Sequence, residues 1–158
     1  MSNATFGAII GDIMVNELSA IVGELGGEAT FGRPIRTGED MSDAIREGFL
    51  HSVVDALVGS SGLTLQEVAS SLDLSTRSLQ RRKHQGRLAR YESDRLYRLA
   101  RLLALADYFI GDREKTIGWM KRPNLVLGGI PPLKLLDTEL GARQVENILG
   151  RIGYGGVS

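Results

Sequence analysis

The segment TLQEVASSLDLSTRSLQRRK, residues 64–83, has the spacing of two short helices joined by a tight turn. Thr64 and Glu67 have the three-residue spacing of a reciprocal N-terminal cap, and Ser75 can cap the second helix. Asp73 stands in the turn, where the backbone becomes left-handed, and Asp tolerates that conformation better than most residues. This arrangement predicts a helix-turn-helix.

The apolar residues of the segment fit the same geometry. Ala69 is small enough to let the second helix cross the first closely, and Leu79 anchors the second helix from below. Val68, Leu72 and Leu74 fill the wedge between the helices. The side chains left pointing outward or sideways are Thr76, Arg77, Ser78, Gln80, Arg81 and Arg82.

Positive charge is concentrated around this segment, although the whole chain has a formal net charge of zero. Residues 64–101 carry nine basic and four acidic residues (+5), whereas residues 1–63 carry three and nine (−6). Outward Arg and Gln on a helix in the major groove can bond guanine and adenine, respectively. Lys83, like Arg82, is placed for phosphates, which position a helix without specifying sequence. The segment therefore predicts contact with operator DNA, and a solvated basic face on a structural helix pair is the alternative.

Helical periodicity extends over most of the remaining chain, which predicts an all-α fold. We expect helices at residues 6–25, 41–58, 91–110, 113–121 and 139–152, a loop over 28–40, and one helical turn at 133–136 within an irregular Gly- and Pro-rich stretch. The helices at 6–25 and 91–110 are candidates for dimer contacts, and internal core is the alternative use of their apolar residues. In the last helix the residues expected to face inward are Leu140, Val145, Ile148, Leu149 and Ile152.

These elements suggest three parts. Residues 1–40 form an N-terminal helix and loop, residues 41–110 a helix-turn-helix domain with a long connecting helix, and residues 111–158 a small helical domain. Trp119, the one Trp of the chain, is expected in the core.

Several function classes are disfavoured by composition. The chain has no Cys and only two His, and it contains no GxSxG, phosphate-binding loop or HExxH motif. We therefore expect no enzyme activity, no catalytic residue, no metal and no cofactor. No apolar run approaches the roughly 18–20 residues of a membrane span, and no signal peptide is visible. A cytoplasmic protein without a membrane partner is the simplest expectation.

The C-terminal third resembles a known family. The matching residues are Trp119, Pro123–Asn124, Leu127–Gly128–Gly129, Pro132, Leu135–Leu136, Gly141, Val145 and Leu149, followed by a glycine-rich tail. They resemble the toxin-binding domain of the MbcA/ParS/Xre antitoxins. The preceding residues 88–112 are similar to the connecting helix of that family, and the resemblance extends from Leu63 to Ser158. It implies an Xre-like helix-turn-helix domain followed by a small helical toxin-binding domain.

The resemblance also implies partners. Such antitoxins are encoded beside a RES-domain toxin that consumes NAD or transfers ADP-ribose from it. Their C-terminal helix and tail cover the NAD cleft of the toxin, and their Xre-like domain dimerises and can repress the shared operon. On this chain the toxin-binding residues would be Val145, Ile148, Leu149, Arg151, Ile152 and Tyr154. Arg151 can pair with carboxylates and Tyr154 can stack, whereas intramolecular packing is the alternative for Leu149 and Ile152.

Two functional hypotheses follow. The first is a type II antitoxin that occludes a RES-domain toxin and represses its own operon, as a homodimer within a larger toxin–antitoxin hetero-oligomer. The second is a plain dimeric repressor whose C-terminal domain only dimerises. Under the first hypothesis, deletion of residues 145–158 should abolish neutralisation and leave folding intact.

Overall fold

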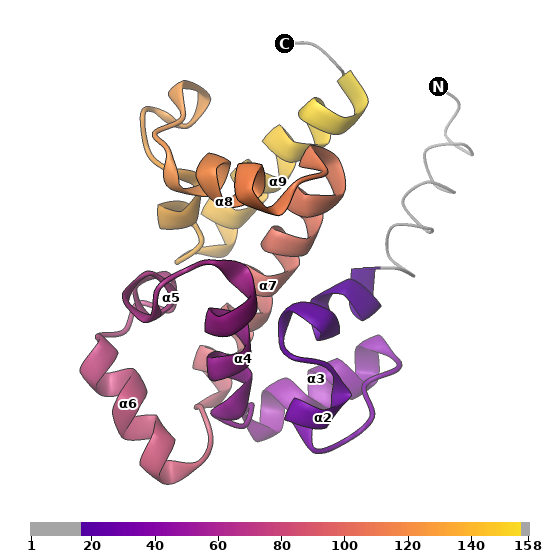
Figure 1. Ribbon diagram of the computed structural model, residues 1–158, viewed down its shortest axis with the longest axis vertical. Coiled ribbons are helices and arrows are strands. Elements are labelled where there is room, and N and C mark those ends of the chain that lie inside the picture. The colour runs from indigo at the N-terminus through magenta and orange to yellow at the C-terminus, as the bar shows by residue number, and fades with distance from the viewer. Residues whose placement is uncertain (1–16, 156–158) are drawn as a thin grey trace.

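The computed structural model describes residues 17–155, with the side chains of residues 154 and 155 outside that description. Every regular element in this range is helical, as the all-α prediction required (Figure 1). Residues 17–24 are helical, and the labelled elements are α2 (Glu28–Phe31), α3 (Gly38–Glu47), α4 (Ser52–Ser61), α5 (Leu65–Ser71), α6 (Thr76–Gln85), α7 (Arg90–Ile110), α8 (Arg113–Lys121), the 3-10 turns η1 (Leu125–Leu127) and η2 (Pro132–Leu135), α9 (Glu139–Gly150) and the π-helical turn η3 (Arg151–Gly155).

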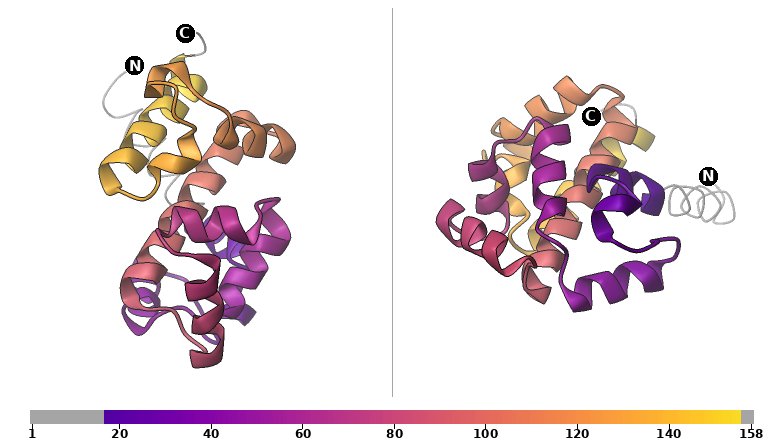
Figure 2. Two further views of the ribbon diagram at one scale, coloured as in Figure 1. Left: turned by 90° about the vertical axis from the view of Figure 1, so that its left-hand side faces the viewer. Right: turned by 60° about the horizontal axis from the view of Figure 1, so that its bottom comes forward.

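Helix α7 is the central helix of the molecule, and most other helices pack against it. Its 21 residues bury one long apolar face, with Leu96, Leu99, Leu102 and Leu103 fully inside. Helix α7 packs against α3, α4 and α5 and also against α8 and α9. Figure 2 shows the orange and yellow C-terminal elements gathered above the magenta helix-turn-helix, with α7 passing between them. Both the elements before α7 and the elements after it therefore pack on this one helix.

The predicted helix at 41–58 is wrong, because the chain breaks at Gly48. This glycine has φ 86°, and a Cβ on it would overlap the carbonyl oxygen of Leu88. The residues that follow pair with the segment after α6: the Leu88 N–H donates to the Phe49 carbonyl at 2.9 Å, and the His51 N–H donates to the Gly86 carbonyl at 3.0 Å. This close crossing of two backbones separates α3 from α4.

The predicted loop at 28–40 is also partly helical. Glu28–Phe31 form the single turn α2, and α3 begins at Gly38 rather than at residue 41. Thr37 and Asp40 explain the earlier start, because Thr37 Oγ1 accepts from the Asp40 N–H and the Asp40 carboxylate accepts from the Thr37 N–H. This capping box lies where the sequence suggested only Gly and Pro breaks.

The N-terminal helix ends where the sequence predicted. Ile21 and Leu25 are buried in the core, and the positive φ angles of Gly26 and Gly27 end the helix. Residues 6–16 of the predicted helix lie outside the described residues. The glycine pair turns the chain back toward α4, which α2 contacts.

The C-terminal elements pack around the second half of α7. Trp119 is half-buried and packs against the core, as expected. The inward placement of Leu140 and Ile152 is wrong, because their side chains are 71% and 41% exposed. Regular α-helix ends at Gly150, and Gly153 then passes directly over the ring of Phe109, where a Cβ would overlap it.

Candidate functional site

The helix-turn-helix is built from local caps that the sequence predicted. Thr64 Oγ1 accepts from the Glu67 N–H at 3.1 Å, and the Glu67 carboxylate accepts from the Thr64 N–H at 2.8 Å. Ser75 Oγ accepts from the Ser78 N–H at 3.0 Å and starts α6. Asp73 has φ 55°, so it supplies the left-handed residue of the turn. These caps fix where the two short helices begin.

A fully buried apolar wedge holds the two helices together. Val68, Ala69, Leu72 and Leu79 have relative exposures of 0–1%. Leu74, predicted in the same wedge, is half-buried and packs against the core. Leu79 is the one fully buried side chain of α6, so most of that helix is at least partly exposed.

The outer face of α6 is a polar stripe. Arg77, Gln80, Arg81 and His84 are all exposed and follow the i, i+3, i+4, i+7 spacing of one helix face. By helical spacing this stripe lies opposite Leu79. The structure therefore brings together three of the predicted DNA-contacting residues and adds His84, which the same spacing could have identified.

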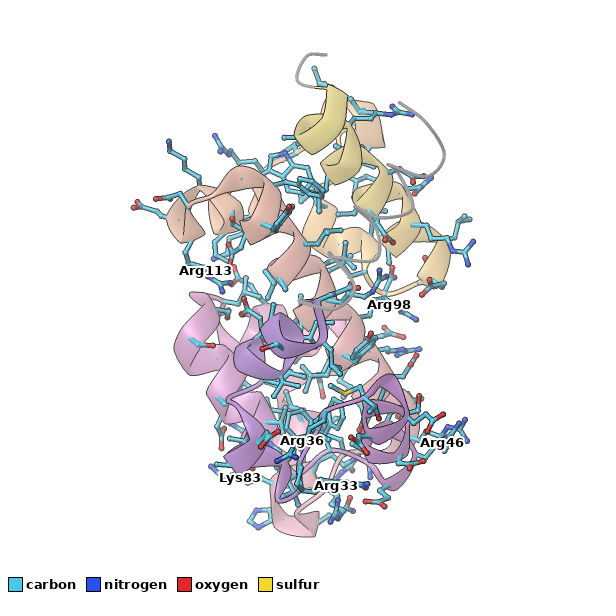
Figure 3. The ribbon with its side chains drawn as sticks, turned by 90° about the vertical axis from the view of Figure 1, so that its right-hand side faces the viewer. Arg33, Arg36, Arg46, Lys83, Arg98 and Arg113 are labelled. Carbon is cyan, nitrogen blue, oxygen red and sulfur yellow. The ribbon has the colours of Figure 1, made fainter. Side chains whose placement is uncertain are left out.

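The other predicted DNA contacts lie at the sides of α6. Lys83 is exposed, and Figure 3 places it near the lower end of the molecule. Thr76 and Ser78 are half-buried, and the Ser75 and Ser78 hydroxyls lie 3.0 Å apart.

Arg82 has an intramolecular partner instead of an open position. Its Nε lies 3.0 Å from Oε1 of Glu92, whose side chain is 1% exposed, and its Nη1 donates to Gln85 Oε1 at 2.8 Å. The Glu92 charge raises the pKa of Arg82. The same Glu92 oxygen accepts from the Ala89 N–H at the start of α7. The Arg82 contacts thus fix α6 against α7, which differs from the phosphate contact that we predicted.

Three arginines of α7 bridge to other elements. Arg95 Nη1 donates to the Leu72 carbonyl at 2.8 Å, at the helix-turn-helix. Arg98 lies 3.3 Å from Glu139, and Arg101 lies 3.0 Å from Glu146, both on α9. Figure 3 shows Arg98 beside the start of the C-terminal elements. These pairs orient α9 on α7.

A second polar cluster ties the N-terminal helix to the C-terminal half. The Arg113 guanidinium contacts the carboxylates of both Glu24 and Asp107, and the Glu24 side chain is only 7% exposed. Burial raises the pKa of Glu24 even though Arg113 opposes that shift. In Figure 3 Arg113 lies at the junction between the two halves.

The predicted toxin-binding residues divide into a packed set and an exposed set. Val145 and Leu149 are fully buried, so they hold α9 in place. Ile148 is half-buried, Arg151 is exposed and Ile152 is 41% exposed. The side chain of Tyr154 lies outside the described residues.

A groove of about 570 Å³ lies between α9 and the η1 loop. It brings Ile148 and Arg151 together with residues that sequence reasoning missed. Its lining is Val126, Leu127, Gly128, Ile130, Leu135, Gln144, Asn147, Ile148 and Arg151. The one signal for the loop was an apolar run between Pro and Gly residues, which is equally compatible with burial.

The two regions match two family models. Residues 40–101 match the antitoxin Xre-like helix-turn-helix domain, and residues 104–155 match the antitoxin Xre/MbcA/ParS C-terminal toxin-binding domain. The protein named Antitoxin Xre from Yersinia enterocolitica is 36% identical over 126 residues, which cover 78% of this chain and 85% of the relative. The chain belongs to the Xre antitoxin family. A second Antitoxin Xre, from Photorhabdus laumondii, is 36% identical over 131 residues, covering 82% of this chain and 88% of the relative. A third Antitoxin Xre, from Pseudomonas putida, is 39% identical over 66 residues, which cover 40% of this chain and 42% of the relative.

Family membership gives each surface a role. As an Xre antitoxin the chain is a binding protein and not an enzyme, with the α6 stripe in its helix-turn-helix domain and the groove in its toxin-binding domain. Within residues 17–155 no cluster of three or more His, Asp or Glu side chains is placed to hold a metal ion. No helix in that part of the chain is long and apolar enough to cross a membrane.

Proposed function

We propose that this antitoxin is a type II antitoxin that covers the NAD-binding active site of a RES-domain toxin and represses its own operon. The observation that carries this proposal is the separation of two different surfaces along α7. Helix α6, which carries the stripe, is fixed to the start of α7 through Arg82 and Glu92, whereas the groove lies between the η1 loop and α9, which packs on α7. The parts that we propose are 1–40, 41–110 and 111–158.

The toxin-facing role falls to the exposed members of the 145–154 segment. Arg151 is exposed at the end of α9 and can pair with carboxylates in a cleft that binds a dinucleotide. Ile148 and Ile152 offer apolar area beside it, and Tyr154 can stack. Val145 and Leu149 act indirectly, since their burial fixes the helix that presents these side chains.

The DNA-facing role falls to the α6 stripe. Arg77, Gln80 and Arg81 can reach base edges in the major groove, and Lys83 can pair with a phosphate. One helix-turn-helix binds weakly, so we propose a homodimer whose two α6 helices enter successive grooves of an operator. The homodimer would form part of a larger hetero-oligomer with the toxin.

A truncation tests the toxin-binding role. Deletion of residues 145–158 would also remove the core residues Val145 and Leu149, so it would not separate toxin binding from folding. A chain ending at Gly150 keeps both of them and removes only η3 and the tail. We expect this variant to remain folded and to bind operator DNA, but to lose inhibition of the toxin. Undiminished inhibition would contradict the assignment of residues 151–158.

The alternative is a dimeric repressor whose C-terminal domain only dimerises. The exposed apolar side chains at the groove would then meet a second copy of the chain. Under this alternative, changes to the groove residues should weaken self-association, and the chain should have no affinity for a RES-domain protein.

A further inference from the structure

Exposed apolar side chains gather on one part of this molecule. Among the described residues, five of the seven large exposed apolar side chains lie between residues 125 and 152. Three of them lie close together in the chain: Leu125 is 93% exposed, Val126 69% and Ile130 42%. Contiguous apolar surface of this kind marks interaction sites, whereas scattered single residues do not.

The loop that carries these residues is internally fixed. The Asn124 side chain accepts from the Val126 N–H at 3.0 Å, and the Asn124 carbonyl accepts from the Leu127 and Gly129 N–H groups at 3.0 and 2.8 Å. The Asn124 N–H donates to the Ile130 carbonyl at 3.3 Å and closes the loop. Leu127 turns inward and packs against the core. Loop 124–130 is therefore a small platform that needs little ordering when a partner covers it.

The platform is continuous with one face of α9. Gln144, Asn147, Ile148 and Arg151 line the groove at i, i+3, i+4 and i+7, so they form one stripe of the helix. Leu140, 71% exposed, extends that stripe by one turn toward the start of α9. The combined surface has an apolar part, in Val126, Ile130 and Ile148, and a polar rim. That composition is typical of a protein–protein interface.

We propose that loop 124–130 is an apolar anchor of the toxin interface, with Leu125 and Val126 entering an apolar depression on the RES-domain toxin. The inference rests on the proposed function and adds a contact outside the 145–154 segment. The occupant is the toxin rather than a second copy, because the loop lies within the matched toxin-binding domain and borders the same groove as Arg151. Arg151 would hold the edge of the NAD cleft while the loop supplies the apolar contact.

The test uses the full chain and the RES-domain protein encoded beside it. Leu125→Asp and Val126→Asp place a charge on the platform, and the high exposure of both residues means that neither change disturbs the core. Tyr91→Asp is the matched control, since Tyr91 is 51% exposed at the far end of α7. Leu125→Met keeps the apolar character. Toxin affinity is measured by calorimetry, self-association by sedimentation, and folding by thermal unfolding.

We expect Leu125→Asp to weaken toxin binding by about 10- to 100-fold, as anchor residues do, and Leu125→Met and Tyr91→Asp to bind as the unaltered chain. Equal affinity in Leu125→Asp and the unaltered chain would overturn the inference and leave the proposed function standing. Loss of self-association without loss of toxin affinity would also overturn it, because the platform would then belong to a homodimer. If the unaltered chain fails to bind the toxin, the proposed function fails and the inference falls with it.

Discussion

The α6 stripe and loop 124–130 present opposite kinds of surface on one small protein. The stripe consists mostly of long, polar or charged side chains such as Arg77 and Arg81, on a helix with one fully buried anchor, Leu79. The loop presents short apolar side chains on a backbone that its own hydrogen bonds hold. Long charged side chains adapt to a charged polymer and attract it over a distance. A fixed apolar platform instead suits one partner of matching shape.

The two surfaces also depend on different supporting contacts. The pair of Arg82 with Glu92 fixes α6, whereas the pairs of Arg98 and Arg101 with α9 fix the groove. Because these contacts use different residues of α7 and different neighbouring helices, we expect that each surface can be damaged without altering the other. Variants in one region should therefore separate DNA binding from toxin binding.

The largest losses of stability are expected on substitution of two glycines, one in the helix-turn-helix region and one in the toxin-binding region. A Cβ at Gly48 would overlap the Leu88 carbonyl, and a Cβ at Gly141 would overlap the Leu135 carbonyl. Gly48→Ala and Gly141→Ala should each lower the free energy of unfolding by more than about 2 kcal/mol. Gly48→Ala should impair DNA binding more, and Gly141→Ala should impair toxin binding more.

Gly59 provides the control for these glycines. It lies in α4 with open space around its Cα, so Gly59→Ala should raise stability by about 0.5–1 kcal/mol. Chemical denaturation measures all three variants. Equal loss of both binding activities in Gly48→Ala and Gly141→Ala would contradict the independence of the two surfaces.

The next effect concerns operator recognition. Arg77→Ala and Arg81→Ala should each weaken specific DNA binding by about 1–3 kcal/mol. Lys83→Ala should weaken binding to all sequences and reduce the salt dependence by about one counterion. Fluorescence anisotropy at several salt concentrations distinguishes these outcomes, and toxin affinity should not change in any of them. Specific binding that survives both Arg variants would move the recognition surface away from α6.

The adjacent residues Arg81 and Arg82 should differ in their contribution to stability. Arg82→Gln leaves the buried Glu92 carboxylate without its ion pair, and because Arg82 is itself partly exposed we expect a stability loss of about 1 kcal/mol. Arg81→Gln should leave thermal stability unchanged, since Arg81 is exposed. If the Arg82 and Arg81 variants unfold at the same temperature, the Arg82–Glu92 pair has no structural role.

The smallest effect is the pH dependence of the cap on α5. Partial burial alone would raise the pKa of Glu67, but the Thr64 N–H and Lys121 lower it overall. Because the folded pKa is the lower one, this stability is present above the unfolded pKa, about 4.3, and is lost as pH falls through the folded value. Glu67→Gln should cost less than about 1 kcal/mol at pH 7 and reduce the loss of stability in acid. An unchanged acid transition would contradict this assignment.

The helix-turn-helix was predictable because its determinants are local. Caps such as Thr64 with Glu67, and the left-handed Asp73, are set by residues a few positions apart. The break at Gly48 was not predictable, because it follows from a crossing with Leu88, forty residues later. The partner of Arg82 was not predictable either. Its charge suggested a phosphate contact, and only the fold shows that it lies beside Glu92.

The toxin-binding surface was predictable only in part. Resemblance pointed to the correct region, but helical spacing could not separate the buried Val145 and Leu149 from the exposed Arg151 without the position of α7. Leu125 and Val126 were missed because an apolar run usually indicates burial. Only the fold shows that the Asn124 hydrogen bonds turn these side chains outward.

The most direct test of the account follows NAD consumption by the RES-domain protein encoded beside this chain while the antitoxin is added. We predict that NAD consumption falls to zero at a fixed molar ratio of antitoxin to toxin. The variant ending at Gly150, added at the same ratio, should leave NAD consumption as fast as in the toxin alone. Undiminished NAD consumption in a large excess of the intact antitoxin would contradict the proposed occlusion of the toxin active site.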